Sequence, residues 1–315
     1  MLYRNLGKTG LKVSEISLGS WLTYGGGVAE DTAVKTIDTA YELGINFFDT
    51  ANVYNRGAAE TVVGRALKKY DRSSYVLATK VYFPMGDGPN DRGLSRKHML
   101  ESADASLKRL GLDYVDILYC HRYDAETPVS ETLRAFDDLI RRGKVLYAGV
   151  SEWSAAQIEE AMRVADKYLL DRIVVNQPQY SMLWRKIEDE ILPVSKKYGV
   201  GQVVFSPLAQ GLLTGKYKTL GDVPAGSRAA SGKMNQFIQR WMNAETFEKV
   251  AKLRAIADRL GIPMAQMALA WVLRLDGVSS ALIGASRPEQ AVQNARASGY
   301  MLPDDALKQI DEALA

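Results

Sequence analysis

Short apolar segments alternate with longer helix-like segments along this chain from about residue 16 onward. The ends of successive apolar segments are about 30 residues apart over most of the chain, which is the length that a βαβ unit requires. Because each segment is almost continuously apolar, it is typical of a parallel strand buried on both faces. The segments are residues 16–20, 46–50, 75–81, 115–121, 145–151, 172–177, 202–207 and 281–286.

Glycine marks several helix-to-strand junctions, as expected for a left-handed helix cap, at Gly44, Gly111, Gly143 and Gly199. Eight consecutive strand-and-helix units predict a closed (β/α)8 barrel. An open, doubly wound sheet is the alternative that the pattern alone leaves open.

Three segments lie outside this repeat. Residues 3–6 and 12–15 flank a Gly-Lys-Thr-Gly turn and predict a hairpin, which we expect to cover the amino-terminal end of the barrel. Residues 209–237 form a long, Gly-rich insertion without a core pattern, and such loops are usually functional lids or disordered. Residues 303–315 predict a final amphipathic helix. We expect residues 1–315 to form one domain.

The composition excludes several classes of function. The chain has 315 residues and a formal net charge of only +3, which gives no electrostatic case for binding nucleic acid. One cysteine precludes an intramolecular disulfide and indicates a reducing compartment. The amino-terminal residues lack the apolar core of a signal peptide, and no apolar stretch reaches membrane-spanning length, so we expect a cytoplasmic protein. With one cysteine and two histidines, we expect no dedicated metal site.

Four ionisable residues stand at or just past the ends of consecutive predicted strands, namely Asp49, Tyr54, Lys80 and His121. The carboxyl ends of parallel strands are where α/β barrels build their active sites. Each residue also has an ordinary interpretation: Asp49 and Lys80 as a buried ion pair, Tyr54 as a packed loop residue, and His121 as a core histidine. Their joint placement favours a site.

Tyr54 acting as a general acid is the hypothesis that uses all four residues. A phenol with a pKa of about 10 donates protons poorly at neutral pH. An ammonium roughly 4 Å away is worth about 4 kcal/mol at an effective dielectric of about 20, so Lys80 could lower the pKa of Tyr54. Asp49 could keep Lys80 charged, and His121 could orient a carbonyl group. The four residues therefore predict a proton donor that assists carbonyl reduction.

Residues 44–54, GINFFDTANVY, resemble the signature of the aldo-keto reductase family, in which the Asp and the Tyr belong to a catalytic tetrad. Lys80 and His121 match the other two members. The resemblance covers essentially the whole chain, and it is strong for the branch that contains the β-subunits of voltage-gated potassium channels and their bacterial relatives. Residues 18–21 (LGSW), 205–208 (FSPL) and 283–286 (IGAS) also resemble that branch.

The resemblance implies NADP(H), bound in an extended form across the barrel mouth. No Gly-x-Gly-x-x-Gly follows the first strand, so a Rossmann-type site is not indicated. Ser151 and Gln177 would bond the carboxamide of the nicotinamide, and Phe205 would stack on its ring. The full set of implied contacts is Ser20, Trp21, Asp49, Ser151, Gln177, Phe205, Ser206, Pro207, Leu208, Gln210, Lys216, Arg228, Gly284, Ser286, Gln290 and Asn294.

Within this set, Ser206, Leu208 and Gln210 would line the pyrophosphate, with Lys216 and Arg228 closing over it. The last four positions would hold the adenosine. Residues 286–288, Ser-Arg-Pro, open the last barrel helix, so free amides and an arginine converge where a 2′-phosphate could bind. This favours NADP over NAD, and the alternative is a capping serine beside a solvated arginine.

Two positions depart from the family pattern. Glu152 stands where many members carry Asn, and its carboxylate cannot donate to the carboxamide oxygen. Gln293 stands where acidic side chains commonly contact the adenine amine.

The resulting prediction is an NADP(H)-dependent reductase of aldehydes or ketones. Trp21 and Tyr82 are candidate walls of the substrate pocket, and core packing is the alternative for Trp21. A second hypothesis is a cofactor-binding regulatory subunit; His121 argues against it because channel β-subunits tend to carry Asn there. A third is a Schiff-base aldolase using Lys80, which needs a neutral lysine. The sequence shows no partner motif and leaves the substrate and the oligomeric state open.

Overall fold

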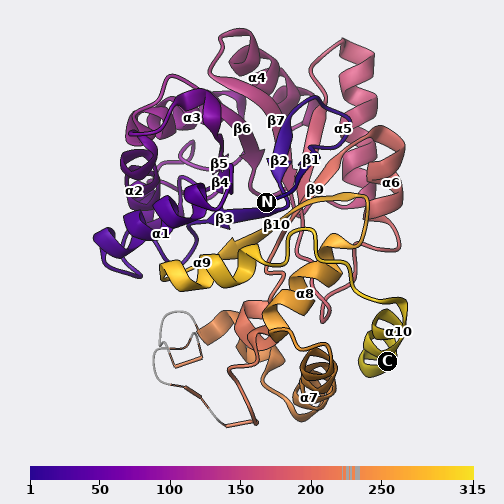
Figure 1. Ribbon diagram of the computed structural model, residues 1–315. Helices are drawn as coiled ribbons and strands as arrows, with labels where there is room; N and C mark the ends of the chain where they lie inside the picture. Colours follow the sequence, from indigo (N-terminus) through magenta and orange to yellow (C-terminus); the bar gives the residue numbers. More distant parts are fainter. Residues whose placement is uncertain (222, 225–226, 228, 231–234) are drawn as a thin grey trace.

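The computed structural model describes residues 1–221, 223–224, 227, 229–230 and 235–315. In these residues, eight parallel strands close into a barrel in the order β10-β3-β4-β5-β6-β7-β8-β9 (Figure 1). The predicted (β/α)8 barrel is therefore confirmed, and the open sheet is wrong. The strands are β3 (Ile16–Gly19), β4 (Phe47–Asp49), β5 (Val76–Val81), β6 (Val115–Cys120), β7 (Val145–Ser151), β8 (Ile173–Gln177), β9 (Gly201–Phe205) and β10 (Val278–Gly284).

Helices pack around the outside of this barrel. They are α1 (Glu30–Glu42), α2 (Ala58–Leu67), α3 (Arg96–Leu110), α4 (Val129–Arg141), α5 (Ala155–Tyr168), α6 (Ile191–Tyr198), α8 (Met264–Leu273) and α9 (Pro288–Ala295). Two further helices, α7 (Ala244–Arg259) and α10 (Asp304–Leu314), lie against each other at the lower edge of the view in Figure 1. Short 3-10 turns complete the elements: η1 (Tyr54–Gly57), η2 (Arg72–Ser74), η3 (Ala209–Thr214), η4 (Asn235–Phe237) and η5 (Gln239–Trp241).

The strand boundaries differ from the predicted ones by a few residues. The last strand, β10, begins three positions earlier than predicted because Ser279 and Ser280 belong to it. Their polar side chains broke the apolar pattern, but the hydroxyl of Ser279 donates to Asn5 O (3.0 Å) and that of Ser280 to Ser14 O (2.7 Å). The strand β9 ends earlier than predicted because Ser206 has a φ of 54°, outside the β region.

The predicted hairpin forms from β1 (Tyr3–Asn5) and β2 (Lys12–Ser14), and it covers the amino-terminal end of the barrel. The backbone N–H of Lys8 donates to Gly199 O at 2.8 Å, next to the start of β9. Gly7 has a φ of 57°, and a Cβ there would lie 2.3 Å from the same oxygen, so the contact requires glycine. Leu6 and Val13 are fully buried in the apolar cluster inside the barrel. The hairpin thus closes the amino-terminal end of the barrel and leaves the carboxyl end free of it.

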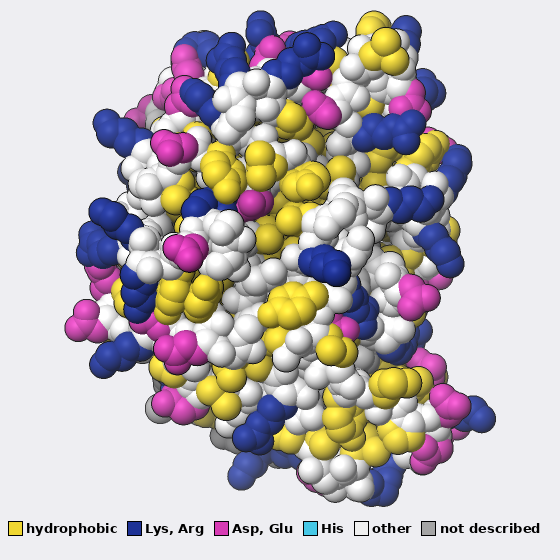
Figure 2. All heavy atoms as spheres, turned by 45° about the horizontal axis from the view of Figure 1, so that its top comes forward, with side chains coloured by type: hydrophobic (Ala, Val, Ile, Leu, Met, Phe, Trp, Pro, Cys, Tyr) yellow, Lys and Arg dark blue, Asp and Glu magenta, His cyan; other side chains and the backbone are white. Residues whose placement is uncertain are grey.

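Most of the core lies between the strands and the surrounding helices. On the face shown in Figure 2, side chains of both charge signs lie mainly around the periphery, and hydrophobic side chains gather nearer the middle. Among the helices that the structure describes, none has the length and apolar character needed to cross a membrane.

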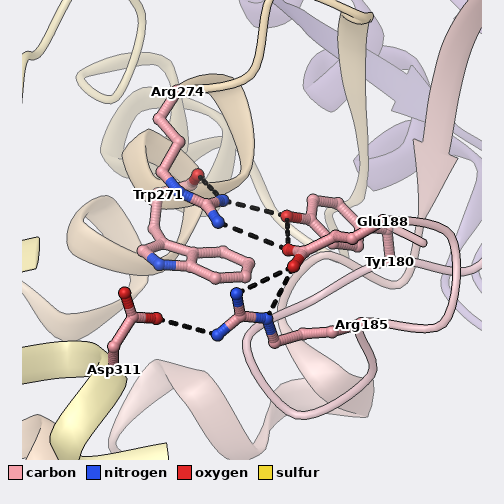
Figure 3. A network of polar contacts seen from close by, with 6 residues as sticks. All are labelled: Tyr180, Arg185, Glu188, Trp271, Arg274 and Asp311. Atoms are coloured by element: carbon pink, nitrogen blue, oxygen red, sulfur yellow. Dashed lines mark hydrogen bonds and ion pairs between the residues drawn. The ribbon is translucent and has the colours of Figure 1, made fainter. Parts of the chain in front are cut away.

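A network of polar contacts joins the segment after β8 to α8 (Figure 3). The carboxylate of Glu188 accepts hydrogen bonds from Arg185 Nη2 (2.8 Å), Tyr180 Oη (2.5 Å) and Arg274 Nη2 (3.3 Å). The guanidinium of Arg274 also lies over the Trp271 ring, with Cζ 3.7 Å from the ring centroid. Burial opposes ionisation of Glu188, but the hydrogen bonds from Arg185 and Tyr180 and the two guanidinium charges hold its pKa below the ordinary value.

The same network reaches the last helix of the chain. Arg185 Nη1 donates to Asp311 Oδ1 in α10 at 2.8 Å, and the Arg185 guanidinium lies 5.2 Å from the Trp271 ring centroid. Trp271 therefore packs between two arginines that share Glu188 as their anion. This arrangement fixes the carboxy-terminal helix to the barrel wall.

Replacing Glu188 by Gln should lower the free energy of unfolding by about 1–3 kcal/mol at about pH 7, because two guanidinium groups lose their charged acceptor. Since the folded-state pKa of Glu188 is depressed, its contribution is present above the unfolded pKa and is lost as the pH falls through the folded pKa. The difference between wild type and variant should therefore shrink below about pH 4. Urea unfolding at several pH values measures it. The exposed Glu190→Gln is the matched control, and an equal loss in both variants would contradict the assignment.

Candidate active site

The four residues singled out from the sequence come together at the open, carboxyl end of the barrel. Asp49 ends β4, Lys80 lies near the end of β5, and His121 directly follows β6. These three strands are neighbours in the sheet. Tyr54 begins η1, five residues after Asp49, and its ring packs edge-on against the His121 ring with centroids 5.6 Å apart.

Lys80 is fully buried, and its amine faces three oxygen acceptors. It contacts Asp49 Oδ1, Thr50 O at 3.0 Å and Tyr54 Oη at 3.4 Å. An ammonium group has three N–H donors, so these three acceptors match the charged form. A Schiff-base nucleophile needs an accessible nitrogen lone pair, which this arrangement does not present.

Asp49 accepts hydrogen bonds through both carboxylate oxygens. Oδ1 contacts Lys80, and Oδ2 accepts from Gln177 Nε2 at 2.9 Å. Burial raises the pKa of Asp49 and lowers that of Lys80, and each shift is opposed by the charge of the other residue. Because the two opposite charges are in direct contact, the pair has no net charge and acts on its neighbours as a dipole.

The Asp49–Lys80 ion pair, which has no net charge, changes the pKa that can be expected of Tyr54. Burial raises the pKa of Tyr54 well above its ordinary value, the charge of Asp49 raises it further, and the charge of Arg122 opposes the shift. The expected net lowering of this pKa is therefore wrong, because burial and the charge of Asp49 outweigh the stabilisation that Lys80 gives to the phenolate. Tyr54 remains a neutral phenol. Since its oxygen accepts from Lys80, its own hydrogen is available to another acceptor.

His121 is also neutral in this environment. Its side chain is buried, and burial, followed by the charges of Lys80 and Arg122, lowers its pKa well below the ordinary value. Its Nδ1 is buried without a hydrogen-bond partner among the residues that the structure describes. A neutral imidazole carries one N–H donor and one acceptor.

Two residues that the sequence did not single out lie beside this group. Phe83 packs edge-on against His121 with centroids 4.9 Å apart, and the guanidinium of Arg122 lies 5.5 Å from the Phe83 ring centroid. The predicted pocket residue Tyr82 contacts Phe83, at 5.2 Å, as the next ring outward. Their positions in the sequence could have indicated them, because Phe83 directly follows Tyr82 and Arg122 directly follows His121.

Trp21, the other predicted pocket residue, packs edge-on against Phe237 with centroids 4.7 Å apart. It is half-buried and follows β3 directly after Ser20, so it lies at the same end of the barrel. The contact joins the first loop of the barrel to the insertion after β9.

Three of the expected cofactor-binding residues support the tetrad through hydrogen bonds. Ser20 Oγ donates to Thr50 Oγ1 (2.9 Å), and Ser151 Oγ donates to Gln177 O (2.9 Å). Gln177 in turn bonds Asp49. The atypical Glu152 has a φ of 58°, and its Oε1 accepts from the backbone N–H of Gln179 at 2.6 Å.

The segment after β9 has a strained backbone. Ser206, Ala209 and Gln210 have φ values of 54°, 45° and 60°. This left-handed conformation costs about 1–3 kcal/mol of free energy for each residue other than glycine. Gln210 Nε2 donates to Ser206 Oγ at 2.6 Å. Phe205 is half-buried at the end of β9, followed by Pro207 and Leu208 in the same turn. Strain of this kind clusters at ligand sites.

Beyond this turn, Lys216 Nζ lies 5.2 Å from the Tyr217 ring centroid. The other predicted cation of the insertion, Arg228, lies outside the described residues.

The segment after β10 carries the remaining expected contacts. Gly284 is exposed, with open space where a side chain would stand. Gln290 Oε1 accepts from the backbone N–H of Ser286 at 2.8 Å and from its Oγ at 3.2 Å. Asn294 is buried in α9. Arg287, rather than Ser286, is the N-cap residue of α9, and its side chain does not cap the helix.

The fold and the site define a closed (β/α)8 barrel with an Asp–Lys pair, a tyrosine and a histidine at its open end. The chain belongs to the Aldo/keto reductase family, whose profile matches residues 15–315.

Several relatives carry the name of potassium channel subunits. A "Probable voltage-gated potassium channel subunit beta" of Arabidopsis thaliana is 46% identical over 300 residues, covering 94% of this chain and 91% of the relative. A "Putative voltage-gated potassium channel subunit beta" of Schizosaccharomyces pombe is 46% identical over 321 residues, covering 99% and 93%. A third, from Oryza sativa subsp. japonica, is 45% identical over 300 residues, covering 94% and 91%. The resemblance to this branch of the family is confirmed.

The raised pKa of Tyr54 predicts the pH dependence of any reaction in which Tyr54 gives up its proton. The active form is the protonated one, so activity is present below this pKa and is lost only as the pH rises through it. We expect kcat of any such reaction, measured with an uncharged substrate, to stay flat from about pH 6 to about pH 9. Steady-state rates across this range check it, with saturating substrates. A falling limb centred between about pH 7 and about pH 9 would contradict a raised pKa.

Proposed function

We propose that this chain reduces the carbonyl group of aldehydes or ketones with NADP(H), and that Tyr54 donates the proton. The observation that carries the proposal is the position of Tyr54 between the charged amine of Lys80 and the neutral ring of His121. Its oxygen accepts from Lys80 at 3.4 Å, and its ring lies against neutral His121. The phenol hydrogen is therefore available to a carbonyl oxygen at the mouth of the barrel.

The residues after β9 and β10 fit a dinucleotide. Phe205 offers a half-buried ring, the strained turn at residues 206–210 places the polar side chains of Ser206 and Gln210 beside it, and Gly284 leaves open space at the end of β10. Ser286 and Gln290 add polar side chains at the start of α9. We infer a preference for NADP over NAD because Arg287 is a cation at this helix N-terminus, where a 2′-phosphate would be attracted. When bound, the nicotinamide supplies a hydride.

The side chains of the tetrad would then have separate roles. Tyr54 Oη gives its proton to the carbonyl oxygen, and the ammonium of Lys80 stabilises the phenolate that remains. Asp49, held by Gln177, keeps Lys80 charged and in place. Neutral His121 can donate its one N–H to the carbonyl oxygen and fix its position.

A second function is favoured by the names of the relatives. We infer as the alternative that the chain is a subunit of a partner protein, as the name "potassium channel subunit beta" says of its relatives. In that function it would bind NADPH and turn over carbonyls slowly. The retained His121 supports the enzyme, because it supplies the carbonyl-orienting group. Rapid aldehyde turnover by the purified chain alone would exclude the purely regulatory function.

Replacing Tyr54 by Phe should lower kcat by about 10²- to 10⁴-fold, the usual contribution of a general acid. The phenyl ring keeps the contact with His121, so folding and cofactor binding should be retained. NADPH oxidation with a reactive aldehyde measures the rate, and fluorescence titration with NADPH measures cofactor binding.

Tyr75→Phe serves as the matched control, since Tyr75 directly precedes β5, at the opposite end of that strand from Lys80, and its ring packs against Phe48. The mechanism would be wrong if Tyr54→Phe retained most of its turnover while still binding NADPH. It would also be wrong if the two variants lost activity equally.

A further inference from the structure

Arg122 is held close to the tetrad by two contacts. Its Nη1 donates to the backbone oxygen of His121 at 2.5 Å, so the side chain folds back over its own strand end. Its guanidinium lies over Phe83, the ring that packs against His121. Arg122 is half-buried, and it is close enough that its charge acts on Tyr54, Lys80 and His121.

Arg122 is also a positive charge that the site does not balance. Across the described part of the chain, no carboxylate lies within 4.0 Å of its guanidinium nitrogens. Asp49 is committed to Lys80, and His121 is neutral. The described site at the open end of β4, β5 and β6 therefore carries one excess positive charge, on a side chain with several unused N–H donors.

The barrel topology separates Arg122 from the region proposed for the cofactor phosphates. That region follows β9 and β10, whereas Arg122 follows β6. In the closed strand order, β6 and β10 are opposite, four positions apart in both directions. The cofactor phosphates would thus lie across the mouth from this guanidinium, and the group that neutralises it has to come from the substrate side.

We propose that Arg122 determines substrate specificity by binding a carboxylate on the carbonyl substrate. The preferred substrates are then aldehydes or ketones that carry a carboxylate beside the reducible carbonyl. This inference rests on the proposed reductase function, which it refines to acidic carbonyl compounds. An arginine presents a planar fork of donors that matches a carboxylate, and Phe83 supports the guanidinium from one face.

A set of paired substrates tests this proposal. The 2-, 3- and 4-carboxybenzaldehydes are each compared with their own methyl esters, so that each pair shares a ring geometry and differs in the charge. For wild type we expect kcat/KM to favour the acid in at least one pair by about 10- to 100-fold, the range for one hydrogen bond between charged groups. Raising the ionic strength should reduce this preference.

Two variants decide whether Arg122 is responsible. Arg122→Gln should bring the acid-to-ester ratio close to one, and Arg122→Lys should retain part of the preference. Arg240→Gln is the matched control: Arg240 bonds Gln179 and packs on Trp184 and Trp241, and it has no carboxylate partner among the described residues. It should leave the ratio unchanged. Taking the ratio within each protein cancels any general effect of a variant on turnover.

Binding provides a readout that does not need turnover. In calorimetry with wild type and NADP, benzoate should bind more tightly than methyl benzoate, and Arg122→Gln should remove the difference. If no wild-type pair favours the acid, or if Arg122→Gln keeps the preference, the assignment to Arg122 is overturned. If wild type reduces neither acids nor esters, the proposed reductase function fails, whereas the benzoate titration still tests whether Arg122 binds a carboxylate.

Discussion

The contact between Lys80 and Asp49 is the interaction on which the site depends. Both side chains are buried at the end of the barrel, where an isolated charge would be costly, and each is stable there because of the other. Removing one partner leaves an unpaired buried charge beside the only phenol of the tetrad. The neighbouring strands β4 and β5 hold the two groups in register, so the barrel itself fixes the geometry that Tyr54 experiences.

The fold could be predicted from the sequence almost completely. Apolar runs near the expected spacing gave all eight barrel strands, and glycine marked helix ends such as Gly111 and Gly199, the left-handed caps of α3 and α6. The start of β10 was missed, where two buried polar residues follow Val278. Ser279 and Ser280 are compatible with β10 only because backbone oxygens from the hairpin region accept their hydroxyls, and a local pattern does not contain that information.

The candidate site could be predicted in position but only partly in its chemistry. The places of Asp49, Tyr54, Lys80 and His121 follow from strand ends, and the structure brings the four side chains together. The direction of the Tyr54 pKa did not follow, because it depends on burial and on the charge of Asp49, which together raise it. Arg122 was overlooked for a similar reason: an arginine without an ion-pair partner is recognised only after every nearby carboxylate has been placed.

The strained turn after β9 has a consequence for how the protein can evolve. Three residues of this turn have left-handed backbone angles although none of them is glycine. This strain raises the free energy of the folded chain before any ligand is present. Glycine at one of these positions would relieve that strain, but it would also give the unfolded chain more freedom and the turn more mobility. Stability and readiness to bind are therefore set by the same few backbone angles, so selection for one at this turn constrains the other.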